Sequence, residues 1–180
     1  MRRIRQVKML FGLVNLSLLV WGSTAMGQPA MHFYNVTGQD FVPICASGGK
    51  TITSRGCFKK TNCSLFSFPV NLPNGSVVKY LEMFFIRHDE SMVLNYNYLN
   101  LMKIDPGVSQ TYLIDIQNSG PTGPDVQRKK SSELSDIINN QNYFYQLLYE
   151  ALSPADVELC GARIYYQLPS NMSYLPMMVK

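Results

Sequence analysis

The sequence predicts an all-β fold, a single antiparallel β-sandwich or jelly-roll-like domain that is stapled by disulfides. Short segments rich in Tyr, Ile and Val alternate between apolar and polar residues with a period of two, as half-buried strands do. Turn-forming clusters of Gly, Pro, Asn and Ser separate these segments, with no βαβ rhythm and no internal repeat. Four cysteines, an even number, follow an N-terminal export signal.

Residues 1–27 have the layout of a secretory signal peptide. A basic head is followed by an apolar run from Met9 to Trp21 and then by small residues that suit cleavage after Ala25 or Gly27. The apolar run is shorter than the roughly 20 residues that span a bilayer, although an uncleaved anchor is the alternative. We therefore expect a secreted or periplasmic protein with no membrane span after signal removal. Residues 28–180 form one domain, with a core at about 33–168 and an apolar tail at 169–180.

Charge argues against nucleic acid as a partner. The chain has 16 Lys and Arg against 12 Asp and Glu, and four of the basic residues precede Gly27. The mature part is therefore neutral overall, and the basic pI belongs to the signal.

The four cysteines are expected to form two disulfides. Three pairings are open; we favour Cys57 with Cys63, which closes a small loop, and Cys45 with Cys160, which ties the first strands to the last. A metal site is the competing interpretation, but these cysteines lack the close paired spacing of a zinc site. We expect no metal ligands and no cofactor.

The first strand signal of the central region follows a turn. Leu72-Pro73-Asn74-Gly75 combines a fixed φ at Pro with two residues that tolerate positive φ. In the run behind it, Leu81, Met83 and Phe85 face one way, and Val78, Tyr80, Phe84 and Ile86 face the other. Apolar residues on both faces predict a strand in the middle of its sheet.

Further strands follow from the same alternation, to a total of about eight. The residues predicted to share a face are Leu94, Tyr96, Tyr98, Met102 and Ile104; Tyr112, Ile114 and Ile116; Tyr143, Tyr145, Leu147 and Tyr149; and Ala162, Ile164, Tyr166 and Leu168. Arg128-Lys129-Lys130 resembles a solvated strand start, and residues 131–140 fit either a short helix or a strand. The tail at 171–180 is expected either to pack back or to meet a partner.

Candidate binding residues come from two features. Tyr96 and Tyr98 beside Asn95 and Asn97 suit a surface that stacks on sugar rings, with a core position as the alternative. The basic loop that contains Arg55, Lys59 and Lys60 suits anionic lipid, polysaccharide or an acidic protein face, with a solvated loop as the alternative.

Catalytic signals are weak. A hydrolase would use Ser91 as nucleophile and His88 as base, but His88 and its neighbour Asp89 would point to opposite faces of a strand, and no Gly-x-Ser-x-Gly motif is present. Acidic residues are scattered, and no pair stands out for glycoside hydrolysis. We assign no catalytic residue.

The run from Phe66 to Val78, with Leu72-Pro73-Asn74-Gly75 inside it, resembles a pattern in uncharacterised exported bacterial β-sandwich proteins with a Leu-Pro-x-Gly strand motif. The segment from Cys160 to Tyr166 is similar to their closing strand. The resemblance covers about residues 33–168, and it implies an extracytoplasmic β-sandwich without supplying an activity.

The sequence therefore predicts a non-catalytic binding or interaction module whose ligand is a protein or a glycan at the cell envelope. Two alternatives remain open: a structural subunit of a secretion or surface assembly, and a hydrolase that uses acidic residues at strand ends.

Overall fold

The computed structural model describes residues 29–53, 55–88, 97–118, 122–152 and 157–169. These residues hold twelve strands and one 3-10 turn, η1 (Gly38–Asp40), with no α-helix among them. The predicted signal peptide and most of the apolar tail lie outside the described residues. No helix within the described ranges is long and apolar enough to cross a bilayer.

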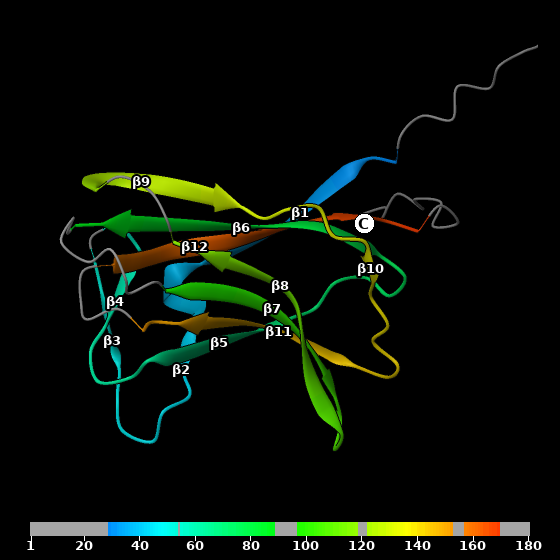
Figure 1. The fold of residues 1–180 in the computed structure, drawn as a ribbon, viewed down its shortest axis with the longest axis horizontal. Coiled ribbons are helices and arrows are strands. Elements are labelled where there is room, and N and C mark those ends of the chain that lie inside the picture. Colours follow the sequence, from blue (N-terminus) through cyan, green and yellow to red (C-terminus); the bar gives the residue numbers. More distant parts are fainter. Residues whose placement is uncertain (1–28, 54, 89–96, 119–121, 153–156, 170–180) are drawn as a thin grey trace, which may run out of the picture.

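The strands form two antiparallel sheets, which Figure 1 shows as two layers. The seven-stranded sheet contains β1 (Met31–Thr37), β3 (Lys50–Ile52), β4 (Phe58–Lys60), β6 (Val77–Arg87), β9 (Gly123–Lys130), β10 (Asp136–Ile137) and β12 (Val157–Gln167). The five-stranded sheet contains β2 (Val42–Pro43), β5 (Leu65–Val70), β7 (Tyr98–Asp105), β8 (Ser109–Gln117) and β11 (Phe144–Glu150), in the order β2-β5-β11-β7-β8. The prediction of an antiparallel β-sandwich is confirmed.

The strand β6 lies in the middle of its sheet, as its two apolar faces predict. It pairs with β12 along one edge and with β9 and β10 along the other. The turn before it forms as expected: Gly75 has φ 79° and the Ser76 N–H donates to the Pro73 carbonyl at 3.1 Å. The predicted faces need one correction, because an irregularity between β6 and β12 next to Lys79 places Val78 in the core with Leu81.

The core lies between the two sheets and is centred on aromatic rings. Phe58 of the seven-stranded sheet contacts Phe66 and Tyr149 of the five-stranded sheet, with ring centroids 4.6 and 5.8 Å apart. All three side chains are fully buried. Burying side chains of this size is the main term that holds such sheets together.

The described residues of β7 that are predicted to share a face do so, but this face lies on the side away from the core. Leu99 and Leu101 are the residues that enter the core, whereas Tyr98, Met102 and Ile104 lie on the other side of the strand. Met102 is nevertheless buried, so apolar residues occur on both faces and the alternation in the sequence did not distinguish them.

A β-bulge changes the face of one predicted residue in β8. The register shifts between Leu101 and Met102 of β7, so that Ile114 and Ile116 enter the core while Tyr112 is 55% exposed. An extra residue in one strand reverses the side on which all following side chains lie.

Other expectations were met in part. In β11 and β12 the predicted inner residues Tyr145, Leu147, Tyr149, Ala162 and Ile164 are buried. Residues 131–140 form no helix; they run irregularly apart from the short strand β10. Arg128-Lys129-Lys130 stands at the end of β9, not at the start of a strand. The strand number exceeds the expected one because β2, β3, β4 and β10 have only two or three residues each.

All four cysteines are in disulfides, but the favoured pairing is wrong. Cys45 bonds to Cys63, and Cys57 bonds to Cys160. The strand β4 separates Cys57 from Cys63 and carries them to different places. Phe58 pairs with Leu159, which brings Cys57 next to Cys160.

Candidate binding surfaces

A groove lies on the outer surface of the five-stranded sheet, where β5, β7 and β11 run side by side. Its volume is about 470 Å³, within the range of ligand pockets in proteins. It is lined by Pro69, Val70, Asn71, Ile104, Asn140, Tyr143, Phe144, Tyr145 and Gln146, and we call it the Phe144 groove. Phe144 is 65% exposed, so a large aromatic ring faces solvent beside side-chain amides.

One wall of the Phe144 groove is fixed by hydrogen bonds to the turn before β6. The Asn140 side-chain amide donates to the Leu72 carbonyl at 2.7 Å, and its backbone N–H donates to Asn74 Oδ1 at 2.9 Å. The Tyr145 hydroxyl accepts from the Asn139 N–H at 3.0 Å. A wall anchored in this way is already formed before a ligand arrives, which lowers the entropic cost of binding.

A smaller hollow of about 320 Å³ adjoins the groove and shares Tyr143 with it. Lys103 Nζ lies 4.2 Å from the centre of the Tyr143 ring and 3.9 Å from Asp136 Oδ1. This cation holds the ring at the boundary between the two hollows.

The outer surface of the seven-stranded sheet has a different character. The strand registers align three rows across it: Tyr80, Tyr165 and Phe33; then Lys130, Glu82, Arg163 and Asn35; then Arg128, Phe84 and Gly161. We call this surface the cationic face. Phe33 is 53% exposed, and its ring meets the Tyr165 ring edge-on at 5.1 Å.

Aromatic rings hold two cations of the cationic face in place. Lys130 Nζ lies 3.9 Å from the centre of the Tyr80 ring and 4.2 Å from that of Tyr165. The Arg163 guanidinium lies over Phe33 and Phe84, at 5.6 and 5.3 Å. Cation–π contacts orient a charged group without neutralising it.

The acidic residue of the second row is buried and satisfied. Glu82 is 4% exposed; it accepts from the Tyr165 hydroxyl at 2.6 Å and lies 3.9 Å from Arg163 Nη1. Burial and then the hydrogen bond to Glu82 raise the pKa of Tyr165, so its phenol stays uncharged at neutral pH. Positive charge therefore dominates the exposed part of these rows.

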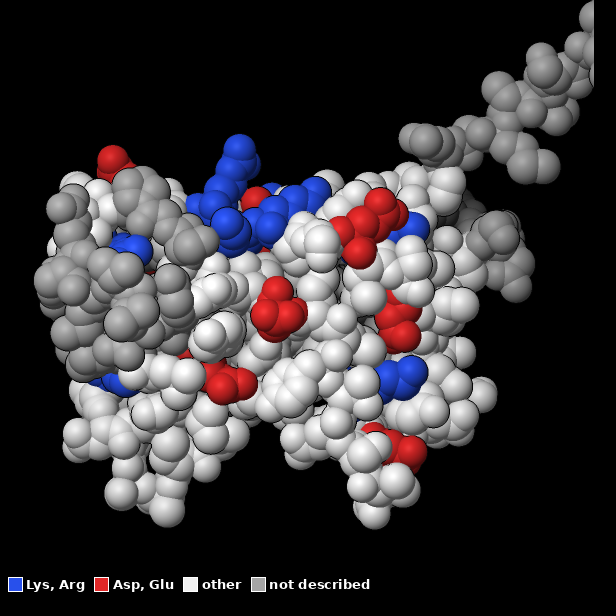
Figure 2. Space-filling view, in the orientation of Figure 1, with Lys and Arg blue, Asp and Glu red and all other residues white. Residues whose placement is uncertain are grey.

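Figure 2 shows Lys and Arg side chains gathered along the upper edge of the molecule, over the C-terminal part of β9. Arg128, Lys129 and Lys130 are all exposed there. Arg128 and Lys130 extend to the cationic face, whereas Lys129, one residue apart, extends to the other side of the strand.

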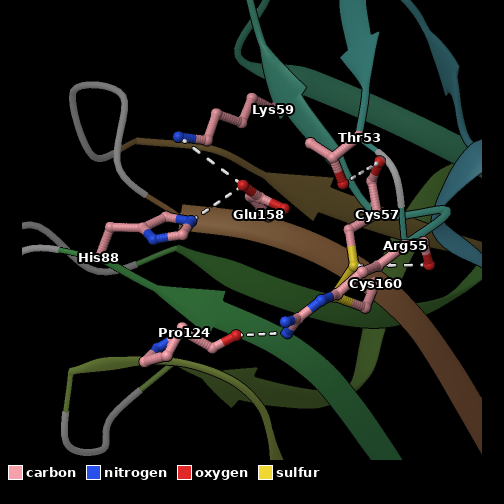
Figure 3. Close-up of polar contacts among 8 residues, drawn as sticks. All are labelled: Thr53, Arg55, Cys57, Lys59, His88, Pro124, Glu158 and Cys160. Carbon is pink, nitrogen blue, oxygen red and sulfur yellow. Dashed lines mark hydrogen bonds and ion pairs between the residues drawn. A yellow bond between two sulfur atoms is a disulfide. The ribbon is translucent and has the colours of Figure 1, made fainter.

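A third site is a shallow pocket of about 210 Å³ where the cationic face ends. His88, directly after β6, donates from Nε2 to Glu158 Oε1 of β12 at 2.9 Å, and Lys59 Nζ of β4 lies 3.7 Å from the same oxygen (Figure 3). Burial by itself raises the pKa of Glu158, but hydrogen bonds from His88 and Thr53 and the charges of His88 and Lys59 outweigh it. The net effect is a lowered pKa.

The His88–Glu158 pair has the geometry of a structural contact. It joins the end of β6 to β12 beside the Cys57–Cys160 disulfide (Figure 3). Catalysis of acyl transfer needs a nucleophile next to the histidine. The described residues that line this pocket offer the hydroxyl of Thr53, which takes part in the hydrogen bonding around Glu158. Ser91 and Asp89 lie outside the described residues.

One residue of the predicted aromatic platform, Asn97, does not lie at the surface. Asn97 is 2% exposed, and its amide donates to the Tyr149 hydroxyl in the core at 2.9 Å. A buried amide needs hydrogen-bond partners inside the protein, and Tyr149 is that partner here. Asn97 is therefore not accessible to a ligand. Tyr98 is half-buried on the outer side of β7. Asn95 and Tyr96 lie outside the described residues.

The cations of the predicted basic loop are held by the fold. Arg55 donates to the Pro124 carbonyl, Lys60 donates to the Ala151 carbonyl, and Lys59 pairs with Glu158. Burial lowers the pKa of Lys60. Arg55 stays exposed and lines the pocket next to the cationic face.

Sequence reasoning missed Phe144, Phe33 and the row that aligns Arg128 with Phe84. A signal for Phe144 was available: it is an aromatic residue at an outward position within the Tyr-x-Tyr-x-Leu-x-Tyr alternation of residues 143–149. The rows of the cationic face join β1, β6, β9 and β12, and the register that aligns them is not written in any single segment.

Comparison with known proteins finds no family model and no curated protein that match the sequence. Solved structures share the fold. A region of the mosquito-larvicidal Cry4Aa toxin from Bacillus thuringiensis has a TM-score of 0.51 and 11% identity, over 76% of this chain and 24% of the toxin chain. A Clostridium thermocellum endo-1,4-β-D-xylanase was solved as CBM22-1–GH10 modules complexed with xylohexaose. It has a TM-score of 0.50 and 10% identity, over 77% of this chain and 28% of the xylanase chain.

The C-terminal CBM6 of LamC, a marine laminarinase from Zobellia galactanivorans, has a TM-score of 0.49 and 13% identity, over 74% of this chain and 98% of that chain. This chain therefore spans about a quarter of the toxin and xylanase chains and nearly all of the laminarinase module. At such identities the likeness to the toxin and the xylanase shows a shared β-sandwich fold.

Proposed function

We propose that this protein is a non-catalytic module that binds a neutral glycan chain in the Phe144 groove. The observation that carries the proposal is the exposed Phe144 ring, set in an apolar groove of about 470 Å³ beside the amides of Asn71 and Gln146. Sugar rings offer apolar C–H faces to an aromatic ring and hydroxyl groups to amides. The groove offers both kinds of contact on one surface.

Two further observations support this proposal. The xylanase chain, 28% of which is covered by the match to this fold, was solved as CBM22-1–GH10 modules in complex with xylohexaose. The two disulfides suit a protein that works in an oxidising compartment, and we infer that the chain is secreted or periplasmic. A glycan outside the cytoplasm is consistent with that location.

The test is titration calorimetry of the mature protein with xylohexaose, followed by a screen of other neutral oligosaccharides. Replacing Phe144 by Ala should weaken binding of the best ligand by about tenfold or more. The ligand would cover the Phe144 ring, and burying a Phe side chain contributes roughly 1.5–3 kcal/mol. Because Phe144 is 65% exposed, the variant should unfold at the same urea concentration as the parent protein.

Phe33→Ala is the matched control: it removes another Phe, 53% exposed, from the opposite sheet. It should leave neutral glycan binding unchanged. Absence of any bound neutral glycan, or equal losses in the two variants, would contradict the proposal.

A further inference from the structure

We propose that the cationic face of the seven-stranded sheet is a second, separate binding surface, and that its ligand is a linear acidic polysaccharide built from uronic acids. The inference goes beyond the Phe144 groove, which lies on the other sheet. It rests on how the described cations and rings are arranged along β1, β6, β9 and β12.

The cations form a track and not a single cluster. Arg163 and Lys130 share one row, Arg128 lies in the next, and Arg55 stands at the pocket beyond, which Ile86 and Glu158 also line. With two residues per row and about 3.3 Å per residue, the track from Phe33 to this pocket is about 20 Å long. Such a length suits an extended polymer with repeated negative charges.

The cations are available to a ligand. Within the described ranges, no carboxylate lies within ion-pairing distance of Arg128 or Lys130, and the ring contacts of Lys130 leave its ammonium donors charged. Glu133, which accepts a hydrogen bond from Tyr80, pairs with Lys79 at 3.2 Å, and the buried Glu82 pairs with Arg163 at 3.9 Å. These carboxylates offset the charges of Lys79 and Arg163, so among the described residues the uncompensated positive charge of the rows is that of Arg128 and Lys130.

The rings favour a sugar acid over other anions. Phe33 exposes its apolar surface directly beside the Arg163 guanidinium. A uronic acid residue carries an apolar ring face and a carboxylate together, and guanidinium matches carboxylate geometry. Amphipathic helices that bind membranes insert a continuous apolar face beside their basic residues, whereas the cationic face alternates rings with cations across a sheet.

The experiment measures binding of the mature protein to polygalacturonate, with its fully methyl-esterified form as the uncharged probe of the same backbone. We expect binding to polygalacturonate that weakens as salt is raised from about 50 to 300 mM, because salt screens exposed charges. The esterified polymer should bind at least about tenfold more weakly.

Two variants locate the surface. Arg128→Gln with Lys130→Gln should weaken polygalacturonate binding by about tenfold, whereas Lys129→Gln, on the other side of the same strand, should change it by less than about twofold. Phe144→Ala should leave polygalacturonate binding intact, and the double variant should leave neutral glycan binding intact. Either proposal can therefore be disproved without affecting the other.

Several outcomes overturn the inference. They are equal binding of the esterified polymer, a larger loss in Lys129→Gln than in the double variant, loss of acid-polymer binding in Phe144→Ala, or no binding at all. Tighter binding to phosphatidylglycerol vesicles or to oligothymidylate than to polygalacturonate would also overturn it.

Discussion

Glu158 shows how one buried carboxylate organises the end of a sheet. Its side chain is 9% exposed and is held by His88, directly after β6, at 2.9 Å and by Lys59 of β4 at 3.7 Å. A carboxylate buried to this degree destabilises a fold unless partners compensate for lost hydration. Here the partners lie on either side of β12, at the end of β6 and on β4. The ionised carboxylate of Glu158 is stabilised by these partners, and its contacts in turn link β12 to its neighbours.

The first prediction concerns the pH dependence that follows from Glu158. Its pKa is lowered in the folded protein, so its contribution to stability is present above the unfolded pKa of about 4.3 and disappears as pH falls through the lower folded pKa. Glu158→Gln should reduce the free energy of unfolding by about 1–3 kcal/mol at pH 7. The difference from the parent should shrink as pH falls from 5 toward 3, measured by urea unfolding.

Glu133→Gln is the control for this measurement. Glu133 also pairs with a lysine, Lys79 at 3.2 Å, but its side chain is 57% exposed. Exposed pairs contribute less than about 1 kcal/mol. If both variants lose the same free energy with the same pH profile, the role of Glu158 assigned here is wrong.

At the scale of strands, alternation in the sequence identified the elements better than their faces. In β11 the residues Tyr145, Leu147 and Tyr149 enter the core as predicted, although Leu148 between the last two is also apolar and buried. In β7 both sides are apolar, so Leu99 and Leu101 were indistinguishable from Tyr98 and Met102. In β8 a bulge placed Tyr112 outside, and no local residue pattern announces a register shift that arises from pairing with β7.

Binding surfaces were less predictable than strands for the same physical reason. Lys130, Glu82 and Arg163 lie in one row because β9, β6 and β12 pair in a particular register. Segments that are far apart in sequence create this row, so no spacing within a segment encodes it. Asn97 shows a different limit: a polar residue between tyrosines predicts a surface position, but its side chain donates to the Tyr149 hydroxyl in the core.

The second structural prediction concerns the contact between β1 and β12. An added Cβ at Gly161 would lie 2.5 Å from the Val36 carbonyl oxygen, in the backbone of the paired strand. Gly161→Ala should therefore destabilise the protein by about 1–3 kcal/mol, because a backbone atom cannot move aside as a side chain can. Urea unfolding followed by circular dichroism measures this loss.

Gly123→Ala provides the matched comparison on β9. An added Cβ at Gly123 meets no heavy atom within 4 Å, so this change should alter stability by less than about 1 kcal/mol. Equal effects at the two positions would show that β1 does not approach β12 as described.

At the scale of the whole molecule, the two disulfides lie around the short strands β3 and β4 at one edge of the seven-stranded sheet. The strands β3 and β4 have three residues each, and β4 pairs with β12 at a single position, Phe58 with Leu159. So few ladder hydrogen bonds hold this edge weakly. The Cys57–Cys160 bridge fastens β4 to β12, and the Cys45–Cys63 bridge fastens the chain before β3 to the chain after β4.

The last prediction compares the two bridges. Cys57 and Cys160 are 103 residues apart, and Cys45 and Cys63 are 18 apart. If restriction of the unfolded chain dominates, removal of the long-range bridge by Ala at both positions should cost about 5 kcal/mol, against about 3 for the short one. Each pair has one fully buried member, Cys57 or Cys63, so the cavity terms are matched. Urea unfolding of the two double variants, after peptide mapping of the parent has verified both bridges, measures the order; a larger loss for the short bridge would show that native contacts around Cys45 and Cys63 outweigh chain entropy.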